Sequence, residues 1–208
     1  MLDRTSLDAE LRALDSEGLA VSKKIVGFRS IALRYFLPPY MPSPLRCPTG
    51  DEVEFGSRFA VSRHLHKCLY AALDAETAHR EGNQLFYTNL ARGVRSVKTP
   101  VEVVIIGVRF NLKRMLDLRD PGIQRRLGTT SEELAGKWYT VPDAPTQRLG
   151  DAAHACGAFE GLIYRSVRNP GGTCLVAFPD RLADGSFIEF QSRTPGVPRA
   201  RLGRGGSA

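Results

Sequence analysis

Leucines recur at helical spacing close to the N-terminus of the chain. Leu7, Leu11 and Leu14 lie three or four residues apart and follow a Thr-Ser pair that can cap a helix. This pattern predicts a helix over 5–17 that ends at Gly18. Similar patterns, with Asp120 or the Thr130–Ser131 pair as caps, predict further helices over 76–91, 120–128, 130–138 and 144–157.

Short apolar runs bounded by turn-forming residues predict the strands. The run over 101–110 is almost unbroken, which is typical of a central strand buried on both faces. Residues 161–178 form two apolar runs around a Pro-Gly turn and predict a hairpin. Because strands, hairpins and helices are interspersed, the order favours an α+β fold, with a mixed β-sheet core and flanking helices. The remaining predicted strands cover 23–31, 54–61, 67–73 and 186–192.

The first strand of the hairpin carries polar side chains on otherwise apolar faces. Side chains alternate along a strand, so Leu162, Tyr164 and Ser166 share one face while Ile163, Arg165 and Val167 share the other. Apolar residues on both faces predict a strand that is covered on both sides. Its hydroxyl and its guanidinium are therefore candidates for chemistry.

Composition makes the chain an ordinary soluble globular protein, with 42% hydrophobic and 25% charged residues in 208. The net charge is +7, but residues 193–208 hold four arginines and no acid, and subtracting these four charges leaves +3 for residues 1–192. We expect this Gly- and Pro-rich tail to be disordered. No apolar run is long enough to cross a bilayer, and the polar N-terminus has no signal-peptide core. We therefore expect a cytoplasmic protein without a membrane partner.

The cysteines and histidines do not form a recognisable metal motif. The four cysteines include no CxxC pair. His64, His66 and Cys68 follow a two-residue spacing that would place them on one face of a strand. A metal would need an enclosed site with further ligands, and we therefore expect none.

Five side chains stand out as candidates for a binding or catalytic site. Thr77 and Glu81 lie four apart on the predicted helix, so they share a face and the hydroxyl can orient the carboxylate. Tyr70 ends the preceding strand and can bring its ring near that face. Arg29 lies among apolar neighbours in its predicted strand, where it either pairs with a carboxylate or binds a phosphate. Arg58 has the same two interpretations.

Several of these segments resemble, in the same order, the RES domain, the toxin half of RES–Xre toxin–antitoxin modules. The resemblance covers residues 24–180 and rests on "FRS", "FGSRF", "CLYAALDAETAHRE", "MLDLRDPGIQRRLG" and "TQRLGDAAHACGAFEGLIYRSVRNPGGTCLVAF". It implies a fold like that of ADP-ribosyltransferase toxins. We therefore expect a RES domain over 24–192, preceded by a helical extension over 1–23 and followed by the tail over 193–208.

The resemblance also implies catalytic roles. Arg29, Glu81 and Ser166 stand at the positions of the arginine, glutamate and serine that give the family its name. Glu81, oriented by Thr77, would stabilise the positive charge that develops on the ribose when NAD is cleaved. Arg29 would bind the diphosphate of NAD. Ser166 would bind the substrate or hold Glu81 in place.

Three further positions belong to the expected site or lie beside it. Tyr70 would stack on the nicotinamide or the ribose, and with Thr77 it counts among the expected NAD-binding residues. Arg58 is a second phosphate ligand, although "GSRF" here replaces the family's usual "GGRW". Arg165, next to the family serine, is interpreted as structural or peripheral.

The implied activity consumes NAD as the substrate, by hydrolysis or phosphorolysis. The alternative is transfer of ADP-ribose to a host protein, which needs the same cleavage. The implied partner is an Xre-like antitoxin that covers the active site, and operator DNA would be bound only through that antitoxin. Two other hypotheses stay open. One is a basic nucleic-acid-binding module, although no helix-turn-helix or aromatic-basic pattern is present; the other is a RES fold that only binds partners, although all three named residue types are in place.

Overall fold

The structure is a computed structural model that describes residues 1–33, 44–50, 56–82, 102–138, 141, 143–191 and 199–203. Its helices are α1 (Arg4–Ser16), α2 (Ala75–Gly82), α4 (Pro121–Arg126), α5 (Ser131–Leu134), α6 (Pro145–Cys156) and the 3-10 helix η3 (Pro179–Arg181). Its strands are β1 (Val21–Ala32), β2 (Leu69–Ala72), β3 (Val103–Asp117), β4 (Gly161–Arg165), β5 (Thr173–Ala177), β6 (Phe187–Phe190) and β7 (Ala200–Gly203). Among the described helices, none combines the length and apolar content needed to span a bilayer.

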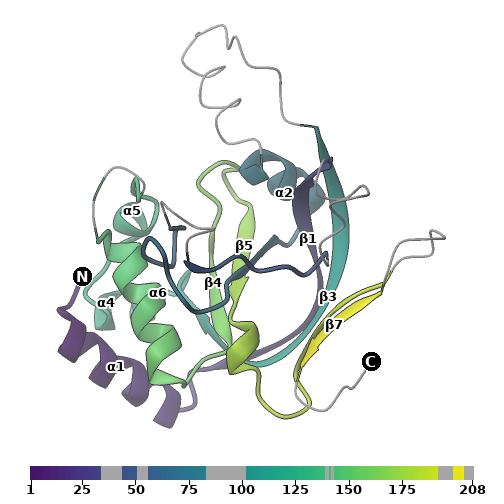
Figure 1. Ribbon diagram of the computed structural model, residues 1–208. Coiled ribbons are helices and arrows are strands. Elements are labelled where there is room, and N and C mark those ends of the chain that lie inside the picture. The colour runs from purple at the N-terminus through teal and green to yellow at the C-terminus, as the bar shows by residue number, and fades with distance from the viewer. Residues whose placement is uncertain are drawn as a thin grey trace, which may run out of the picture.

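All of the described strands belong to one curved sheet. Its order is β1-β2-β5-β4-β3-β6-β7, and β1 also pairs with β3, so the sheet closes on itself. β4 runs parallel to β3, whereas the other paired strands are antiparallel. Figure 1 shows β1 and β3 curving together round one side of the molecule, with α1, α4, α5 and α6 gathered on the other. The predicted α+β fold with a mixed sheet is confirmed.

β4 separates two apolar cores, one on each face of the sheet. Leu162 packs in a core that includes residues of α1 and α6, whereas its neighbour Ile163 packs in a second core with residues of β3 and β6. Leu162 is 0% and Ile163 2% exposed. Arg165, at the end of the strand, is exposed. The predicted hairpin and its two covered faces are thus confirmed, and Arg165 is peripheral to both cores.

The N-terminal helix α1 is part of the first core. Leu7, Leu11 and Leu14 are each 0% exposed and pack in the same cluster as residues of α6. Each buried leucine contributes about 1.5–3 kcal/mol relative to an exposed one. The N-cap is Asp3, whose carboxylate accepts a hydrogen bond of 3.0 Å from the backbone N–H of Ser6. The extension expected over 1–23 is therefore packed into the domain.

The strand predicted over 54–61 is wrong for its described part. Here the chain forms a tight loop in which a single bridge joins Ser57 to Ala60. Gln147 of α6 donates its side-chain amide to the backbone carbonyls of both residues, at 3.1 and 3.2 Å. These carbonyls are therefore bound to a helix instead of a neighbouring strand. Residues 51–55 lie outside the described part of the chain.

The disorder expected over 193–208 is wrong for the stretch that forms β7. This strand pairs antiparallel with β6 along its whole length. The guanidinium of Arg201 also lies over the ring of Phe187, 4.3 Å from its centre, a favourable cation–π contact. Pairing with β6 thus orders a segment whose own composition indicates a disordered tail. Residues 192–198 and 204–208 lie outside the described part.

β3 changes its sheet partner along its length, and Glu160 occupies the junction. β6 pairs with β3 at 109–111, and β4 pairs with it at 115–117. Between these segments, one carboxylate oxygen of Glu160 accepts hydrogen bonds from the backbone N–H groups of Lys113 and Arg114. The other oxygen accepts from that of Ala183. Glu160 is 1% exposed, so a buried carboxylate satisfies N–H groups where the two partner strands leave a gap.

Candidate functional site

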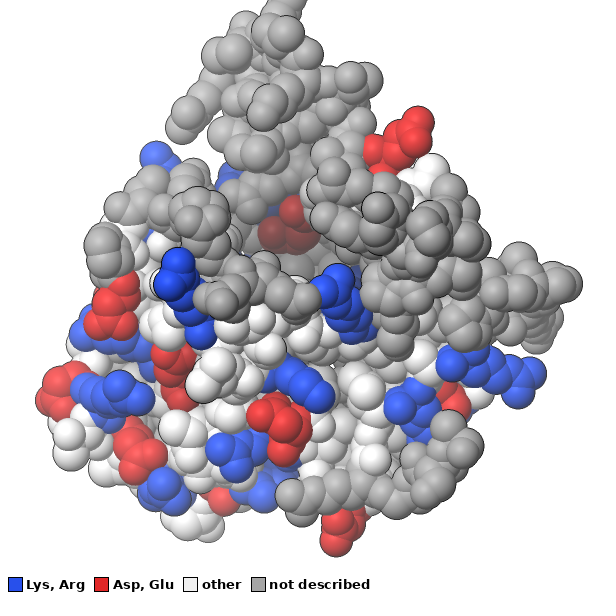
Figure 2. Space-filling view, viewed as in Figure 1, with Lys and Arg blue, Asp and Glu red and all other residues white. Residues whose placement is uncertain are grey.

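A cavity of about 300 Å³ opens where β1 and β2 meet. The two strands share a single register pair, Phe28↔Ala72, and the cavity lies beside it. On the face drawn in Figure 1, Figure 2 shows a hollow with acidic side-chain atoms inside it. The cavity collects side chains from separate parts of the chain that sequence analysis had selected one by one, and its lining includes Arg29, Arg58, Tyr70 and Glu81.

Glu81 is held by the turn that follows β4. The hydroxyl of Ser166 donates a hydrogen bond of 2.6 Å to Glu81 Oε1, and the backbone N–H of Val167 donates to the same oxygen at 3.2 Å. The thiol of Cys174 lies 4.0 Å from it. All of these donors reach Oε1, which leaves Oε2 without a donor from the described part of the chain. The carboxylate is therefore fixed through one oxygen, and the other is left to a ligand.

Ser166 is bonded to Glu81, as expected for a residue that holds this carboxylate in place, and its contact with a substrate stays a prediction. Its hydroxyl oxygen accepts hydrogen bonds from the backbone N–H groups of Arg168 (3.1 Å) and Asn169 (3.0 Å). A hydroxyl has two acceptor positions and one proton. Because both acceptor positions are used, its proton is directed to Glu81. Ser166 is 9% exposed, so this contact is largely shielded from water.

Thr77 does not orient Glu81 as the spacing predicted. Its hydroxyl donates to Asp74 Oδ2 at 2.6 Å and accepts from the side-chain amide of Asn169 at 2.7 Å. Asp74 therefore competes with Glu81 for the Thr77 hydroxyl. It stands at the start of α2, where its Oδ1 also accepts from the backbone N–H of Thr77 in the manner of an N-cap. These two hydrogen bonds, the side-chain one first, lower the pKa of Asp74. Of the helix predicted over 76–91, residues 83–91 lie outside the described part.

Arg29 enters the cavity wall as a half-buried cation. Its guanidinium donates to the backbone carbonyls of Pro44, at 3.1 Å, and Arg46, at 2.8 Å. Burial lowers its pKa, and the nearby thiol of Cys47 acts weakly in the opposite direction. Among the described residues no carboxylate lies within ion-pair distance of Arg29. A half-buried cation in this state favours an anionic ligand, because carbonyl dipoles alone do not neutralise it.

Arg58 also lines the cavity, and its guanidinium is bound to α5. It donates to the carbonyls of Leu134 (2.9 Å) and Gly136 (3.2 Å), at the end of that helix. These bonds anchor the loop of residues 56–60 to the helical side of the molecule. Arg58 thus has a structural role in this arrangement, and its use as a phosphate ligand stays a prediction.

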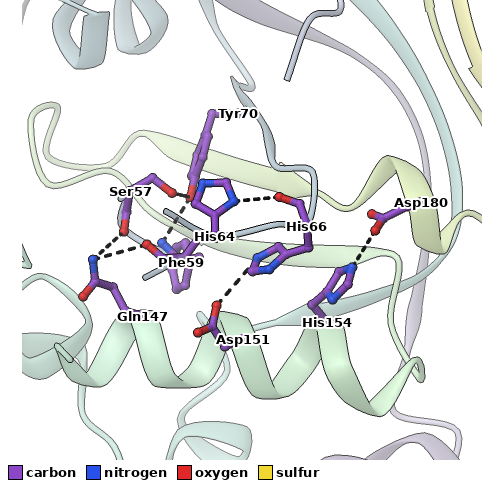
Figure 3. Close-up of polar contacts among 10 residues, drawn as sticks. Ser57, Phe59, His64, His66, Tyr70, Gln147, Asp151, His154 and Asp180 are labelled. Atoms are coloured by element: carbon purple, nitrogen blue, oxygen red, sulfur yellow. Dashed lines mark hydrogen bonds and ion pairs between the residues drawn. The ribbon is translucent and has the colours of Figure 1, made fainter. Parts of the chain in front are cut away.

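The ring of Tyr70 lines the cavity while its hydroxyl is anchored behind it (Figure 3). The hydroxyl shares a hydrogen bond of 2.8 Å with Ser57 Oγ and accepts one of 3.1 Å from the backbone N–H of Phe59. Burial raises the pKa of Tyr70, so the phenol stays protonated and neutral. A neutral, fixed ring is suited to stacking and not to proton transfer.

The row of His64, His66 and Cys68 is a packing arrangement in a loop and not a strand. Figure 3 shows His64 bonded through Nδ1 to the backbone carbonyl of His66, at 2.7 Å. The His66 ring stacks on that of His154 of α6, with centres 4.3 Å apart. Burial, the largest cause, lowers the pKa of His66 to about 4, so its ring is neutral at neutral pH. Among the described residues no group of three or more His, Cys, Asp or Glu side chains could hold a metal.

Several other residues of the site were not predicted, among them three aromatic side chains and an asparagine. Phe28, Trp138 and Tyr164 line the cavity, and Asn169 supports it from the turn after β4. Tyr164 shares a strand face with Ser166, so the alternation along β4 could have identified it. Asn169 precedes the Pro-Gly pair of the turn, where an asparagine ordinarily indicates only turn geometry.

Comparison with known proteins agrees with this architecture. The profile of the RES domain family matches residues 39–197. No curated protein matches the sequence. Among solved structures, a chain of the M. tuberculosis MbcT–MbcA toxin–antitoxin complex is similar, with a TM-score of 0.59 and 16% sequence identity over 95% of this chain and 92% of that one. At this level of identity the likeness concerns the fold.

Proposed function

Since the chain belongs to the RES domain family, we propose that it is the toxin of a toxin–antitoxin pair and that it cleaves the nicotinamide–ribose bond of NAD. The observation that carries this proposal is the fixed carboxylate of Glu81 in a cavity that also holds the half-buried guanidinium of Arg29. One group is suited to a developing positive charge and the other to a bound negative charge. NAD has both on one molecule, because its diphosphate is negative and its ribose becomes positive as the bond to nicotinamide breaks.

Cleavage breaks the bond between C1′ of the ribose and the nicotinamide nitrogen. The electron pair of that bond leaves with the nicotinamide, which becomes neutral, and positive charge develops on the ribose as in glycoside hydrolysis. The carboxylate of Glu81 stabilises this charge and accepts a hydrogen bond from a ribose hydroxyl through Oε2. Because Ser166 and Val167 already fix Oε1, the carboxylate needs little reorganisation when the charge develops.

The remaining groups bind and orient the substrate. Arg29 binds the diphosphate, because a planar guanidinium matches phosphate oxygens and this one lacks a carboxylate partner among the described residues. Arg58 lines the same cavity and is the second candidate for this role. Tyr70 stacks on the nicotinamide or the ribose. Because its phenol is neutral, Glu81 is the group that stabilises the positive charge on the ribose.

The acceptor of the ribosyl group sets the outcome. Attack by water or phosphate at C1′ depletes NAD, whereas attack by a protein side chain makes the same chain an ADP-ribosyltransferase. We favour NAD depletion, and the transferase is the alternative. By analogy with the MbcT–MbcA complex, an antitoxin partner, Xre-like in this family, covers the cavity, and any operator DNA is bound through that partner.

Nicotinamide release from NAD by the purified chain tests the proposal. Glu81→Gln keeps the shape of the side chain and its hydrogen bond from Ser166 but removes the charge, so the rate should fall at least about 100-fold. Glu76→Gln is the matched control, because Glu76 lies on the same helix, pairs only with Arg80 among the described residues and is largely exposed. Stimulation by phosphate distinguishes phosphorolysis from hydrolysis.

Two results would count against the proposal. If Glu81→Gln releases nicotinamide as fast as the wild-type chain, the carboxylate is not the catalytic group. If the wild-type chain releases none, labelled NAD in a cell lysate shows whether a protein acceptor is required. A lysate without any labelled product excludes NAD cleavage by this chain under those conditions.

A further inference from the structure

We propose that Asn169 is a positioning residue for Glu81, which rests on the function proposed above. The turn of residues 166–172, between β4 and β5, is bonded to α2 at two points. One is the bond from Ser166 to Glu81, and the other is the bond from the side-chain amide of Asn169 to Thr77. We call this arrangement the turn clamp.

The direction of the second bond follows from its neighbours. The carboxylate of Asp74 can only accept, so the hydroxyl of Thr77, 2.6 Å away, must donate its proton there. The free acceptor position on Thr77 Oγ1 then requires a donor, and the Nδ2 group of Asn169 lies 2.7 Å from it. Thr77 is 0% exposed, so water cannot replace that donor without opening the structure. The site thus requires an amide at position 169.

The two points of the clamp lie at different positions along the axis of α2. Thr77 and Glu81 lie four residues apart on one helix face, about 6 Å apart along the axis. Two bonds at different positions along the axis restrain the turn against the helix more than one bond would. The turn also touches the helix directly at Gly172, where an added Cβ would lie 2.5 Å from Thr77 Oγ1.

Asn169 also acts on the first point of the clamp. Its backbone N–H donates to Ser166 Oγ at 3.0 Å, and its backbone carbonyl accepts from Gly172 at 2.8 Å, which closes the turn. The occupied acceptor position on Ser166 helps to direct the serine proton toward Glu81. Asn169 therefore acts on the Glu81 carboxylate in two ways: its backbone N–H orients Ser166, and its side-chain amide binds Thr77 on the helix that carries Glu81.

The test is Asn169→Asp, which keeps the side-chain shape but replaces the amide donor with a carboxylate facing Thr77 and Asp74. We expect kcat for NAD cleavage to fall by about 10- to 100-fold, with KM within about 3-fold, because a misplaced catalytic group costs rate more than substrate binding. Asn111→Asp is the matched control, because the Asn111 amide donates to the carbonyl of Gly185 on the surface.

A double variant distinguishes positioning from a general loss of stability. If Asn169 acts through Ser166, then Asn169→Asp combined with Ser166→Ala should be little slower than Ser166→Ala alone, since the two changes disrupt one unit. Additive losses in kcat would overturn the coupling. Thr77→Val removes the oxygen that accepts from the Asn169 amide, so it should reproduce the loss.

Hydrogen exchange gives a readout that does not depend on NAD. In Asn169→Asp, amide exchange in residues 166–172 should accelerate at least about 10-fold while that of α6 is unchanged, because local opening precedes global unfolding. Unchanged exchange overturns the clamp whatever the activity. Faster exchange with a wild-type kcat overturns its effect on Glu81. A wild-type chain that never cleaves NAD refutes the proposed function, and the exchange result still decides the clamp.

Discussion

Replacing Glu160 by alanine should destabilise the domain more than almost any other single polar substitution. The carboxylate is 1% exposed and accepts three backbone hydrogen bonds, two from β3 and one from Ala183. Each buried N–H left without an acceptor costs about 1–3 kcal/mol. Water entering the space left by the side chain can serve one of them, so we expect a loss of about 4 kcal/mol. That is a large fraction of the 5–15 kcal/mol typical of a domain.

Urea unfolding followed by circular dichroism measures this loss. Glu160→Gln should lose less, about 2 kcal/mol, because its amide oxygen still serves Lys113 and Arg114 while its NH₂ group faces the N–H of Ala183. Glu102→Ala, at an exposed position just before β3, is the control and should stay within about 0.5 kcal/mol of the wild type. A loss below about 1 kcal/mol for Glu160→Ala, or a larger loss for the glutamine variant, would refute the reasoning.

Two further predictions concern α6. Gly150→Ala would place a Cβ 2.0 Å from the carbonyl oxygen of Phe59, so it should lower the free energy of unfolding, measured by calorimetry, by about 1–3 kcal/mol. Gly107→Ala, where the Cβ would make only a 3.7 Å contact, is the control and should be neutral. Equal effects of the two substitutions would contradict the close packing of Gly150. Burial raises the pKa of Asp151 from 3.8 to about 6, so the folded state binds its proton more tightly and loses stability as pH rises from 4 to 6. Asp151→Asn should therefore gain up to about 2 kcal/mol relative to the wild type over that range in urea unfolding, after allowing for partial exposure. A constant difference between the two proteins from pH 4 to 7 would exclude the effect.

Elements that depend on residues close in sequence were predictable, because amphipathic spacing is a local property. Leu7, Leu11 and Leu14 define α1, and the alternation from Leu162 to Arg165 defines the two faces of β4. Elements held by distant partners were not. β7 lies in a tail whose composition indicates disorder, and its order comes from pairing with β6, which no local pattern in the tail records.

The same distinction applies to the candidate site. Spacing placed Thr77 and Glu81 on one helix face, and that placement is correct, but it could not say which group each would bind. The contact with Ser166 joins residues 85 apart in sequence, so only the resemblance to a family brought Ser166 and Glu81 together beforehand. Position on a face follows from the helix period, whereas the partner depends on which turn packs there.

Thr77 shows why this difference matters for function. A hydroxyl one turn before a carboxylate can donate a hydrogen bond to it, yet the Thr77 hydroxyl donates to Asp74 at the start of the helix instead. That choice leaves an acceptor position open on Thr77, which the amide of Asn169 fills, and leaves Glu81 to be held by Ser166 of the same turn. The carboxylate is therefore aligned by the packing of a hairpin turn against a helix and not by the helix alone. A substitution in that turn should consequently change the reaction rate before it changes substrate affinity.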